Sequence, residues 1–280
     1  MFRHADCPCD KTFFNWVSEQ LGWKQGPVRF EPEIQIPGFT YDCQALRGEL
    51  HDLTRSAPVT SWRSQAPGAV FGMSLHHDPD GPSSERYCGS FGHPRYKTYS
   101  PADYFKVPMM DIGSAMKGDY LDEFAFRSPI PEIEHMPELR RIWAWFSRPV
   151  VRGTLRILLG DKAVVSMPDG GGMHTDQPPE MAVRINLTVQ SSPSFGLEYE
   201  GFPPVFTESG GYRVVCTDVN HRVYVKNPDP IARVHVVFDV VPWFDYDQDQ
   251  DAWTPNEFFM KKHPYDMIVD GDFGPRVGAV

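Results

Sequence analysis

The sequence predicts a mainly β protein, in which a sandwich or barrel in the C-terminal half is covered by a helical and loop-rich N-terminal half. From residue 153 onward, short β-type runs follow one another with turn residues between them. The 280 residues include 27 prolines and 23 glycines, a content typical of many turns and short strands rather than of a helix bundle. Hydrophobic residues make up 41%, which is enough for a packed core.

The expected strands share a high content of β-branched and aromatic residues. In chain order they are TLRILL, KAVVSM, MAVRINLTVQ, SFGLEYE, YRVVCTD, HRVYVK and ARVHVVFDVV.

Helices are expected over residues 11–21, 44–54 and 137–146. Over 44–54 the apolar stripe consists of Ala45, Leu46, Leu50 and Leu53. Pro137 suits the first turn of the third helix, and Pro149 should end or kink it.

We expect one continuous domain with three parts. Residues 1–152 form the helical and loop-rich N-terminal region, 153–250 the β core and 251–280 a C-terminal extension. Within the first part, residues 56–135 show no regular pattern.

Charge and hydropathy limit the partners of the chain. The net charge of −10 is poorly suited to non-specific binding of nucleic acid or of anionic membranes. No run of 18 apolar residues predicts a spanning helix, and the N-terminus lacks the apolar core of a signal peptide. We therefore expect a soluble, cytoplasmic protein that has neither nucleic acid nor a membrane as its partner.

The five cysteines predict no disulfide framework, because their number is odd and their spacing irregular. Cys7 and Cys9 form a C-x-C pair, but no second pair completes a zinc site, which favours free thiols.

His174 and Asp176 are the first candidate metal ligands. On an extended backbone residues i and i+2 point to the same side, so both side chains can reach one ion. The third ligand must come from another strand, and His221 opens a strand further along the chain. Two histidines and one carboxylate are the ligand set of non-haem Fe(II) oxygenases.

Two alternatives remain open at this point. His174 and Asp176 can instead form a turn with a capping Asp and a surface His. A second H-x-D, His76 and Asp78, lies in LHHDPDG without an evident strand lattice, and DPDG is typical of a turn.

Arg184 lies inside the mainly apolar expected strand MAVRINLTV, and Arg233 lies at the start of a second one, ARVHVVFDVV. A charge in such a strand is costly unless paired, and a guanidinium pairs well with a carboxylate. The partner is either an acidic co-substrate or a strand carboxylate such as Glu198, Glu200 or Asp239.

Taken together, HTD, RIN and the run from His221 to Pro242 resemble the aspartyl/asparaginyl β-hydroxylase family of Fe(II)/2-oxoglutarate dioxygenases. The resemblance covers about residues 155–243 and implies a double-stranded β-helix, or jelly roll. In this resemblance, His174 and His221 match the two metal-binding histidines of the family. Arg184 matches its strand arginine, and Arg233 matches the arginine that binds the distal carboxylate of 2-oxoglutarate. Asp239 and Pro242 match the aspartate and proline that follow that arginine.

The sequence departs from the family at two places. Asn186 stands where the family often has a histidine, and Pro178 and Pro179 stretch the spacing before Arg184. The resemblance implies Fe(II), 2-oxoglutarate and O₂ as cofactor and co-substrates, with Asn186 as a further co-substrate contact. Asp176 brings the chain closer to branches that hydroxylate free amino acids and acyl chains.

Two other functions stay open: a cupin-like binding protein without turnover, and a metal cupin enzyme that does not use 2-oxoglutarate. Residues 84–105, with His93 among them, are rich in aromatic and basic residues and form either a substrate lid or a packed loop.

Overall fold

The computed structural model describes residues 2–3, 34–61, 70–81, 83, 86–87, 123–160, 172–226 and 229–275. Every pair of neighbouring strands in these ranges runs antiparallel. Of the helices in this part of the chain, none has both the length and the apolar composition needed to cross a membrane.

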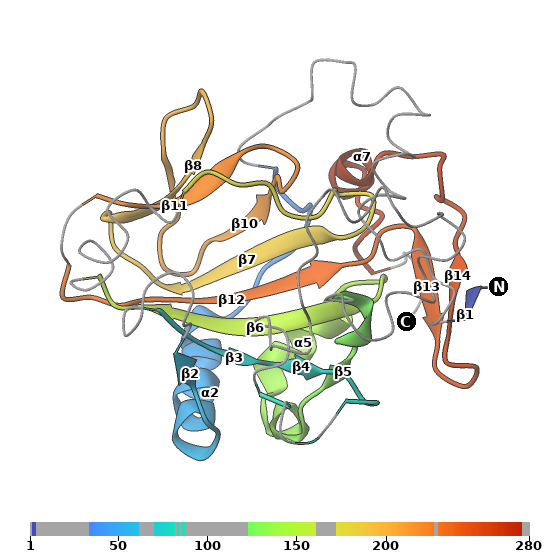
Figure 1. Ribbon diagram of the computed structural model, residues 1–280, viewed down its shortest axis with the longest axis horizontal. Coiled ribbons are helices and arrows are strands. Elements are labelled where there is room, and N and C mark those ends of the chain that lie inside the picture. The colour runs from blue at the N-terminus through green and yellow to red at the C-terminus, as the bar shows by residue number, and fades with distance from the viewer. Residues whose placement is uncertain are drawn as a thin grey trace, which may run out of the picture.

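The largest sheet, called the main sheet below, has six strands in the order β10-β7-β12-β6-β3-β2 within the described residues. Figure 1 shows β10, β7, β12, β6 and β3 stacked in this order. The strands are β2 Thr60–Ser61, β3 Val70–Ser74, β6 Val150–Leu158, β7 Val183–Gln190, β10 Tyr212–Val215 and β12 Arg233–Val240. The central strand β12 is therefore flanked by β7 and β6, and β3 from the N-terminal half extends the sheet.

A smaller sheet, the minor sheet, has the order β11-β8-β9. Its strands are β8 Phe195–Tyr199, β9 Val205–Phe206 and β11 His221–Val225. Phe195 packs against Val70 and Leu158 of the main sheet, and Val223 and Val225 lie against the same apolar cluster. The two antiparallel sheets thus enclose an interior, so the predicted mainly β, jelly-roll core is confirmed.

The remaining elements flank this core. They are β1 Phe2–Arg3, β4 His76–His77, η6 Glu123–Ala125, β5 Ser128–Pro129, η7 Pro131–His135, β13 Phe244–Asp247, β14 Ala252–Pro255 and α7 Pro264–Val269. β1, β14 and β13 form one small sheet, and β4 and β5 form another.

Helix α2, Cys43–Ser56, begins at the N-cap Asp42, whose side chain accepts hydrogen bonds from the N–H groups of Gln44 and Ala45. It buries Leu46, Leu50 and Leu53. The predicted helix over 44–54 is confirmed, but Ala45 is exposed and does not belong to the buried stripe.

Helix α5, Pro137–Trp145, confirms the predicted third helix and ends before Pro149. The Glu49 carboxylate of α2 accepts hydrogen bonds from the first N–H groups of α5, those of Glu138 at 2.6 Å and Leu139 at 3.1 Å. A negative charge at a helix N-terminus is favourable, so this contact fixes the two helices relative to one another.

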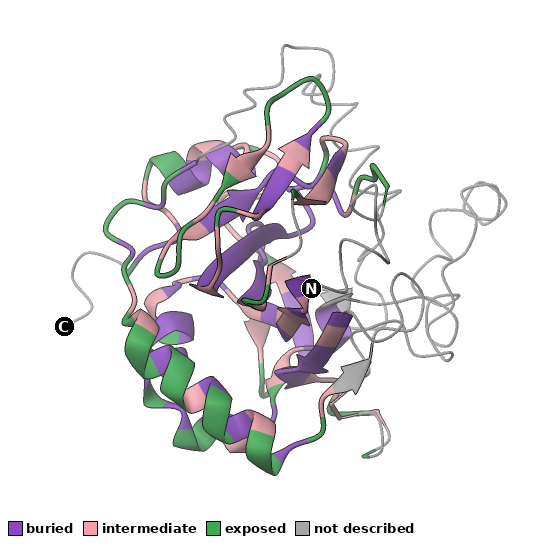
Figure 2. Ribbon diagram, turned by 90° about the vertical axis from the view of Figure 1, so that its left-hand side faces the viewer, coloured by how far each residue is buried: buried purple, intermediate pink, exposed green. Residues whose placement is uncertain are grey.

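The two faces of the main sheet have different compositions, which β7 illustrates. Val183, Ile185 and Leu187 join the hydrophobic core together with the helices, whereas the alternating residues Arg184 and Asn186 point to the opposite face and are also buried. Figure 2 shows the strands as largely buried, with exposed surface mainly on helices and loops. The polar face is therefore an interior surface, turned toward the minor sheet.

Six of the seven expected strands are confirmed by β6, β7, β8, β10, β11 and β12. The seventh, KAVVSM, and the helix over 11–21 lie outside the described residues, as do Cys7 and Cys9. The expectation of an irregular stretch over 56–135 is wrong where β2, β3, β4 and β5 form, because these short strands gain their hydrogen bonds from partners. Cys43 and Cys216 are free thiols.

Candidate active site

The HTD segment runs beside the start of β11. An isolated β-bridge joins His174 to His221: the His174 N–H donates to the His221 carbonyl at 3.0 Å, and the His221 N–H to the His174 carbonyl at 2.9 Å. The Asp176 N–H donates to the carbonyl of Thr217 at 2.8 Å. Gly172, at a φ of 82°, allows the chain to turn into this pairing.

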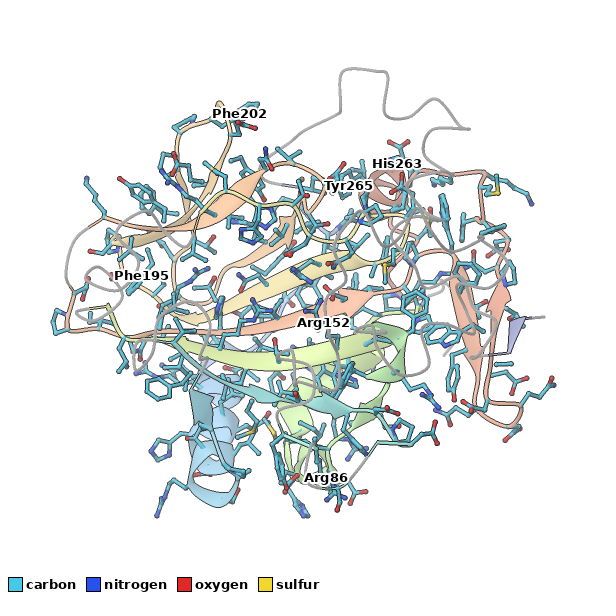
Figure 3. The ribbon with its side chains drawn as sticks, in the orientation of Figure 1. Arg86, Arg152, Phe195, Phe202, His263 and Tyr265 are labelled. Atoms are coloured by element: carbon cyan, nitrogen blue, oxygen red, sulfur yellow. The ribbon has the colours of Figure 1, made fainter. Side chains whose placement is uncertain are left out.

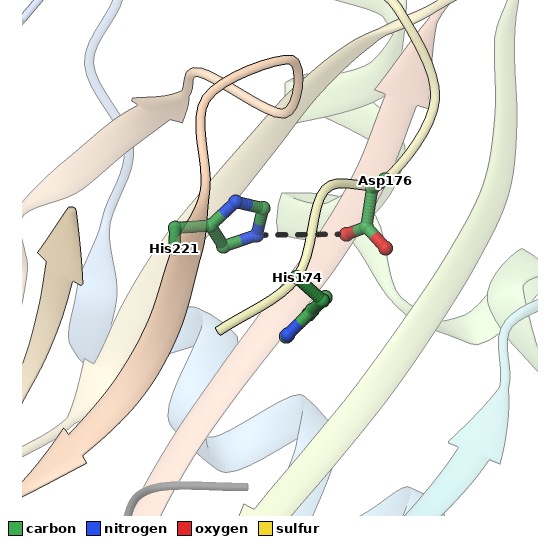
Figure 4. Close-up of side chains that lie close together, drawn as sticks. All are labelled: His174, Asp176 and His221. Atoms are coloured by element: carbon green, nitrogen blue, oxygen red, sulfur yellow. Dashed lines mark ion pairs between the residues drawn. The ribbon is translucent and has the colours of Figure 1, made fainter. Parts of the chain in front are cut away.

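The side chains of His174, Asp176 and His221 come together as the sequence predicts. One possible ligand atom of each lies within 4.8 Å of the others. The Nε2 atom of His221 is 3.7 Å from Oδ2 of Asp176, and Figure 4 shows the two groups directed toward one another, with His174 beside them. His221 is buried and His174 is exposed, so the group lies at an edge of the interior.

Backbone carbonyls orient both imidazoles. Nδ1 of His174 lies 3.0 Å from the carbonyl oxygen of Gly172, and Nδ1 of His221 lies 2.8 Å from that of Val219. A carbonyl only accepts, so each Nδ1 carries the hydrogen and each Nε2 keeps its lone pair. Metal-binding histidines are commonly held in this orientation, with Nδ1–H donating to a backbone carbonyl.

Arg184 holds the Asp176 carboxylate from the main sheet. Its Nη1 contacts Oδ2 of Asp176, its Nη2 donates to Oε1 of Gln177 at 2.9 Å, and its Nε donates to Oδ1 of Asp239 at 3.0 Å. Burial alone would raise the pKa of Asp176, but the charge of Arg184, assisted by that of Arg152, holds this pKa well below its usual range. The carboxylate is therefore ionised at neutral pH.

Arg184 thus has the intrachain partner, Asp239, that the sequence left open. Glu198 and Glu200 are paired elsewhere, with Arg222 at 2.6 Å and Asn220 at 2.8 Å. A direct contact between Arg184 and a co-substrate stays a prediction.

Five arginines lie along the polar face of the main sheet or border it. They are Arg152 and Arg156 of β6, Arg184 of β7, Arg213 of β10 and Arg233 of β12. Burial and the charges of Arg184 and Arg152 lower the pKa of Arg156 to about 9. Burial and the charge of Arg213 lower the pKa of Arg233 to about 10. All of these guanidinium groups stay charged at neutral pH, so they make the interior basic although the chain as a whole is acidic.

Arg233 lies deep in this interior with 5% of its surface exposed, and its Nη1 has no hydrogen-bond partner among the described residues. Buried polar groups are nearly always paired, so an orphaned guanidinium nitrogen indicates a place for an acidic ligand. The neighbouring Arg213 is itself cationic, so it adds to the positive charge around Arg233, and its own Nε donates to Oγ1 of Thr207 at 3.0 Å.

Asn186 contacts a histidine on the neighbouring strand: its Oδ1 lies 3.0 Å from Nδ1 of His235. Both side chains are buried, and Nε2 of His235 has no partner among the described residues. Burial, together with the charges of Arg233 and Arg156, holds the pKa of His235 well below its usual value. A neutral histidine therefore sits two residues from Arg233, next to Asn186.

Strand β6 is bulged beside the site. Arg152 has a φ of 50°, and the pairing with β12 shifts between Val237 and Asp239. The bulge brings Nη1 of Arg152 to 3.7 Å from Oδ2 of Asp239. Figure 3 shows Arg152 on the main sheet, well away from Phe195 at the other end of the interior.

The second H-x-D motif, His76 and Asp78, belongs to no cluster of possible metal ligands among the described residues. Asp78 forms the expected turn, because its Oδ1 accepts from the Asp80 N–H at 2.9 Å. The expectation that no strand surrounds this motif is wrong. His76 opens β4, and its Nδ1 accepts a hydrogen bond from the Gly153 N–H at 2.9 Å. Burial and neighbouring His77 lower the pKa of His76 to about 3, so His76 is a neutral packing group.

Three residues of the interior, Arg152, Arg156 and His235, are not among the predicted site residues. A partial signal existed for Arg156 and His235, because each stands in a predicted strand two residues from a polar neighbour, whereas Arg152 precedes the first predicted strand. The segment 84–105 lies outside the described residues except for residues 86–87, and His93 is outside them.

Comparison with known proteins gives weak likenesses only. No protein-family model and no curated protein matches the sequence. Among solved structures, an oxidoreductase of the 2OG-Fe(II) oxygenase family from Burkholderia pseudomallei aligns with 69% of this chain and 77% of its own, at 12% identity and a TM-score of 0.37. A DMSP lyase from Ruegeria pomeroyi aligns with 71% of this chain and 90% of its own, at 13% identity and a TM-score of 0.25. Likenesses at this level decide neither the fold nor the activity, which rest on the strands and side chains described above.

Proposed function

We propose that the chain is an Fe(II)- and 2-oxoglutarate-dependent dioxygenase that hydroxylates an unactivated C–H bond of a small molecule. The observation that carries the proposal is the group of His174, Asp176 and His221, whose ligand atoms lie within 4.8 Å of one another at an edge of the basic interior. Two imidazoles and one carboxylate suit Fe(II), and they leave further positions on an ion open.

The residues fit this ion in three respects. Both imidazoles have their Nε2 lone pairs available, because a carbonyl faces each Nδ1. The Asp176 carboxylate is ionised and fixed by Arg184. No cysteine belongs to the group, which disfavours a structural zinc site.

Bound Fe(II) would supply the oxidative chemistry, in which decarboxylation of 2-oxoglutarate by O₂ is coupled to hydroxylation of the substrate. The chain's own part is binding and orientation. Arg233 pairs through its unpartnered Nη1 with the distal carboxylate of 2-oxoglutarate. Asn186 and His235 lie close by as further hydrogen-bonding groups. The apolar cluster of Val70, Leu158 and Phe195 excludes water from the far end.

The resemblance to the aspartyl/asparaginyl β-hydroxylase family supports an amino acid or an amino-acid-derived substrate. The retained carboxylate Asp176 supports hydroxylation rather than halogenation, which needs the carboxylate's place open for a halide.

The proposal is tested by measuring metal binding and turnover in matched variants. Protein loaded with Fe(II) without oxygen should bind about one 2-oxoglutarate per chain and form succinate when air is admitted. His174→Ala and His221→Ala should lose metal binding and succinate formation, whereas His51→Ala, an exposed histidine on α2, should keep both. Unchanged metal binding and turnover in both site variants would refute the assignment.

A cupin-like binding protein without turnover is the second candidate. The observation that favours it is the contact between Arg184 and Asp176, because a guanidinium can neutralise this carboxylate without an ion. Metal analysis of protein purified without oxygen, followed by titration with 2-oxoglutarate, separates the two. A third possibility, a metal enzyme that does not use 2-oxoglutarate, predicts that Arg233→Ala leaves activity unchanged.

A further inference from the structure

The connection between β10 and β11, residues 216–220 and called the ligand loop below, orients two of the three candidate metal ligands. The carbonyl of Thr217 accepts a hydrogen bond from the N–H of Asp176 at 2.8 Å. The carbonyl of Val219 lies 2.8 Å from Nδ1 of His221 and accepts the hydrogen of that nitrogen. A shift of the loop would therefore turn both the carboxylate and the imidazole away from a shared ion.

The minor sheet holds the two ends of the ligand loop. The N–H of Cys216 donates to the phenol oxygen of Tyr199 at 3.2 Å. The carbonyl of Asn220 accepts the N–H of Glu200 at 2.8 Å. These bonds act on the first and last residues of the loop, so its middle residue, Asp218, is held by a different part of the chain.

Tyr265 of helix α7 supplies the contact to the middle of the loop. Its hydroxyl donates to Oδ1 of Asp218 at 2.9 Å. Asp218 lies between Thr217 and Val219, so this bond acts on the segment that presents both orienting carbonyls. The C-terminal extension thereby reaches the candidate metal ligands through a single side chain.

Helix α7 is firmly seated on the core, which gives its tyrosine a fixed position. Tyr265, Met267 and Ile268 are each at most 5% exposed and belong to the hydrophobic core. Pro264 opens the helix, and Nδ1 of His263 accepts the Tyr265 N–H at 3.2 Å. Figure 3 shows Tyr265 and His263 close together at this helix. The helix cannot move relative to the ligand loop without disturbing the close-packed core.

We propose that Tyr265 is a positioning residue of the metal site. Its hydrogen bond to Asp218 keeps the ligand loop in the conformation that directs two of the ligands toward one ion. The aromatic ring alone would fill its place in the core but would not hold the loop. This inference rests on the proposed function, because it takes His174, Asp176 and His221 as metal ligands.

The test measures metal affinity in Tyr265→Phe, which loses only the hydroxyl. Mn(II) is added alone to the metal-free full chain, and its binding is followed by electron paramagnetic resonance, so that no turnover is needed. Removing a direct partner of a metal ligand costs about 10–100-fold in metal affinity, and Tyr265 acts one bond further out. We therefore expect Tyr265→Phe to bind Mn(II) about three- to tenfold more weakly than the wild-type chain.

Tyr41→Phe is the matched control. It removes a hydroxyl that donates to the carbonyls of Thr188 and Gly211, each at 3.0 Å and outside the ligand loop. Both tyrosine variants should unfold at lower urea concentration than the wild-type chain, because each loses a hydrogen bond. Only Tyr265→Phe should also lose Mn(II) affinity, which a purely structural role would leave unchanged.

Two variants of Asp218 separate the hydrogen bond from its surroundings. Asp218→Asn and Asp218→Ala have the same charge, but only Asp218→Asn keeps an oxygen that can accept from Tyr265. Asp218→Asn should therefore bind Mn(II) about three- to tenfold more tightly than Asp218→Ala. Adding Tyr265→Phe to Asp218→Ala should cause no further loss, because both changes remove the same bond. Asp218 is exposed, so these variants leave the core unaltered.

Three results would overturn the role of Tyr265. They are a loss of Mn(II) affinity below about threefold in Tyr265→Phe, an equally large loss in Tyr41→Phe, and equal affinities of Asp218→Asn and Asp218→Ala. Each of them leaves the metal site standing, because the wild-type chain still binds Mn(II). If the wild-type chain binds no Mn(II), or if His174→Ala binds it as tightly, the proposed function itself is refuted, and the role of Tyr265 fails with it.

Discussion

Replacing Arg184 with methionine tests whether this arginine is a structural ion-pair partner or a ligand-binding group. The substitution keeps the length and apolar stem of the side chain but removes the guanidinium. It leaves the Asp239 carboxylate, 1% exposed, without the donors at 3.0 Å and 3.3 Å. Arg152, at 3.7 Å, remains as an ion-pair partner of Asp239, and the more distant charge of Arg156 also interacts with this carboxylate.

Breaking a buried ion pair by removing one partner costs about 3–5 kcal/mol, because the other charge stays buried. Since Arg152 partly compensates, we expect Arg184→Met to lower the free energy of unfolding by about 3 kcal/mol, toward the lower end of that range. The matched control is Arg222→Met, whose pair with Glu198 is 26% and 20% exposed. This more exposed pair should contribute about 0–1 kcal/mol.

The assay is equilibrium unfolding in urea, monitored for the two single variants and for Arg184→Met combined with Asp239→Leu. The double variant should recover part of the loss, because neither charge is then left unpaired. A loss below about 1 kcal/mol for Arg184→Met would refute the structural role. If 2-oxoglutarate affinity falls strongly in such a stable variant, Arg184 is a co-substrate ligand instead.

Three further predictions concern the framework of the site. Burial lowers the pKa of His76 to about 3, so on acidification the unfolded chain takes up a proton at this histidine before the folded chain does. The contribution of His76 to the free energy of unfolding should be complete above the unfolded pKa and fall by about 1.4 kcal/mol per pH unit as the pH drops from about 6.5 toward 3. Urea unfolding at several pH values should show that His76→Gln lacks this slope. Gly153→Ala should lower the free energy of unfolding by about 1–3 kcal/mol, because a Cβ there would lie 2.6 Å from Nδ1 of His76 and 2.9 Å from Trp143. Gly48→Ala on α2, where a Cβ would meet nothing within 4 Å, should raise it by about 0.5–1 kcal/mol. Equal effects of the two substitutions on the melting temperature would contradict this. Asp42→Ala should cost about 1 kcal/mol through loss of the α2 N-cap, and Asp42→Asn should restore most of it, as followed by thermal unfolding.

The parts of the fold that the sequence predicts are those governed by local pattern. β7 and β12 have long β-branched runs, and α2 has leucines at helical spacing, so each is recognisable without its partners. β3 and β4 are not, because a glycine, a serine and two histidines interrupt their pattern and only pairing with β6 and β5 makes them strands.

In the candidate site, too, the sequence predicts the features that depend on local spacing but not those that depend on contacts between strands. The spacing of His174 and Asp176 is local, and its geometry follows from the extended backbone. The alternative partners of Arg184 were not separable by sequence, because Asp239 lies on another strand and its contact depends on register. Arg156 and His235 are visible in the sequence as polar residues of predicted strands, but only the fold shows that they lie opposite one another on one interior face.

The bridge between His174 and His221 has a consequence for chain topology. Asp176 and His221 are 45 positions apart in the sequence, and β7, β8, β9 and β10 lie between them. An ion shared by these residues would close that stretch into a loop, much as a disulfide does, and would restrict the unfolded chain more than the folded one if its ligands stayed attached. Four of the strands that build the two sheets would then be tied at both ends by a single reversible cross-link.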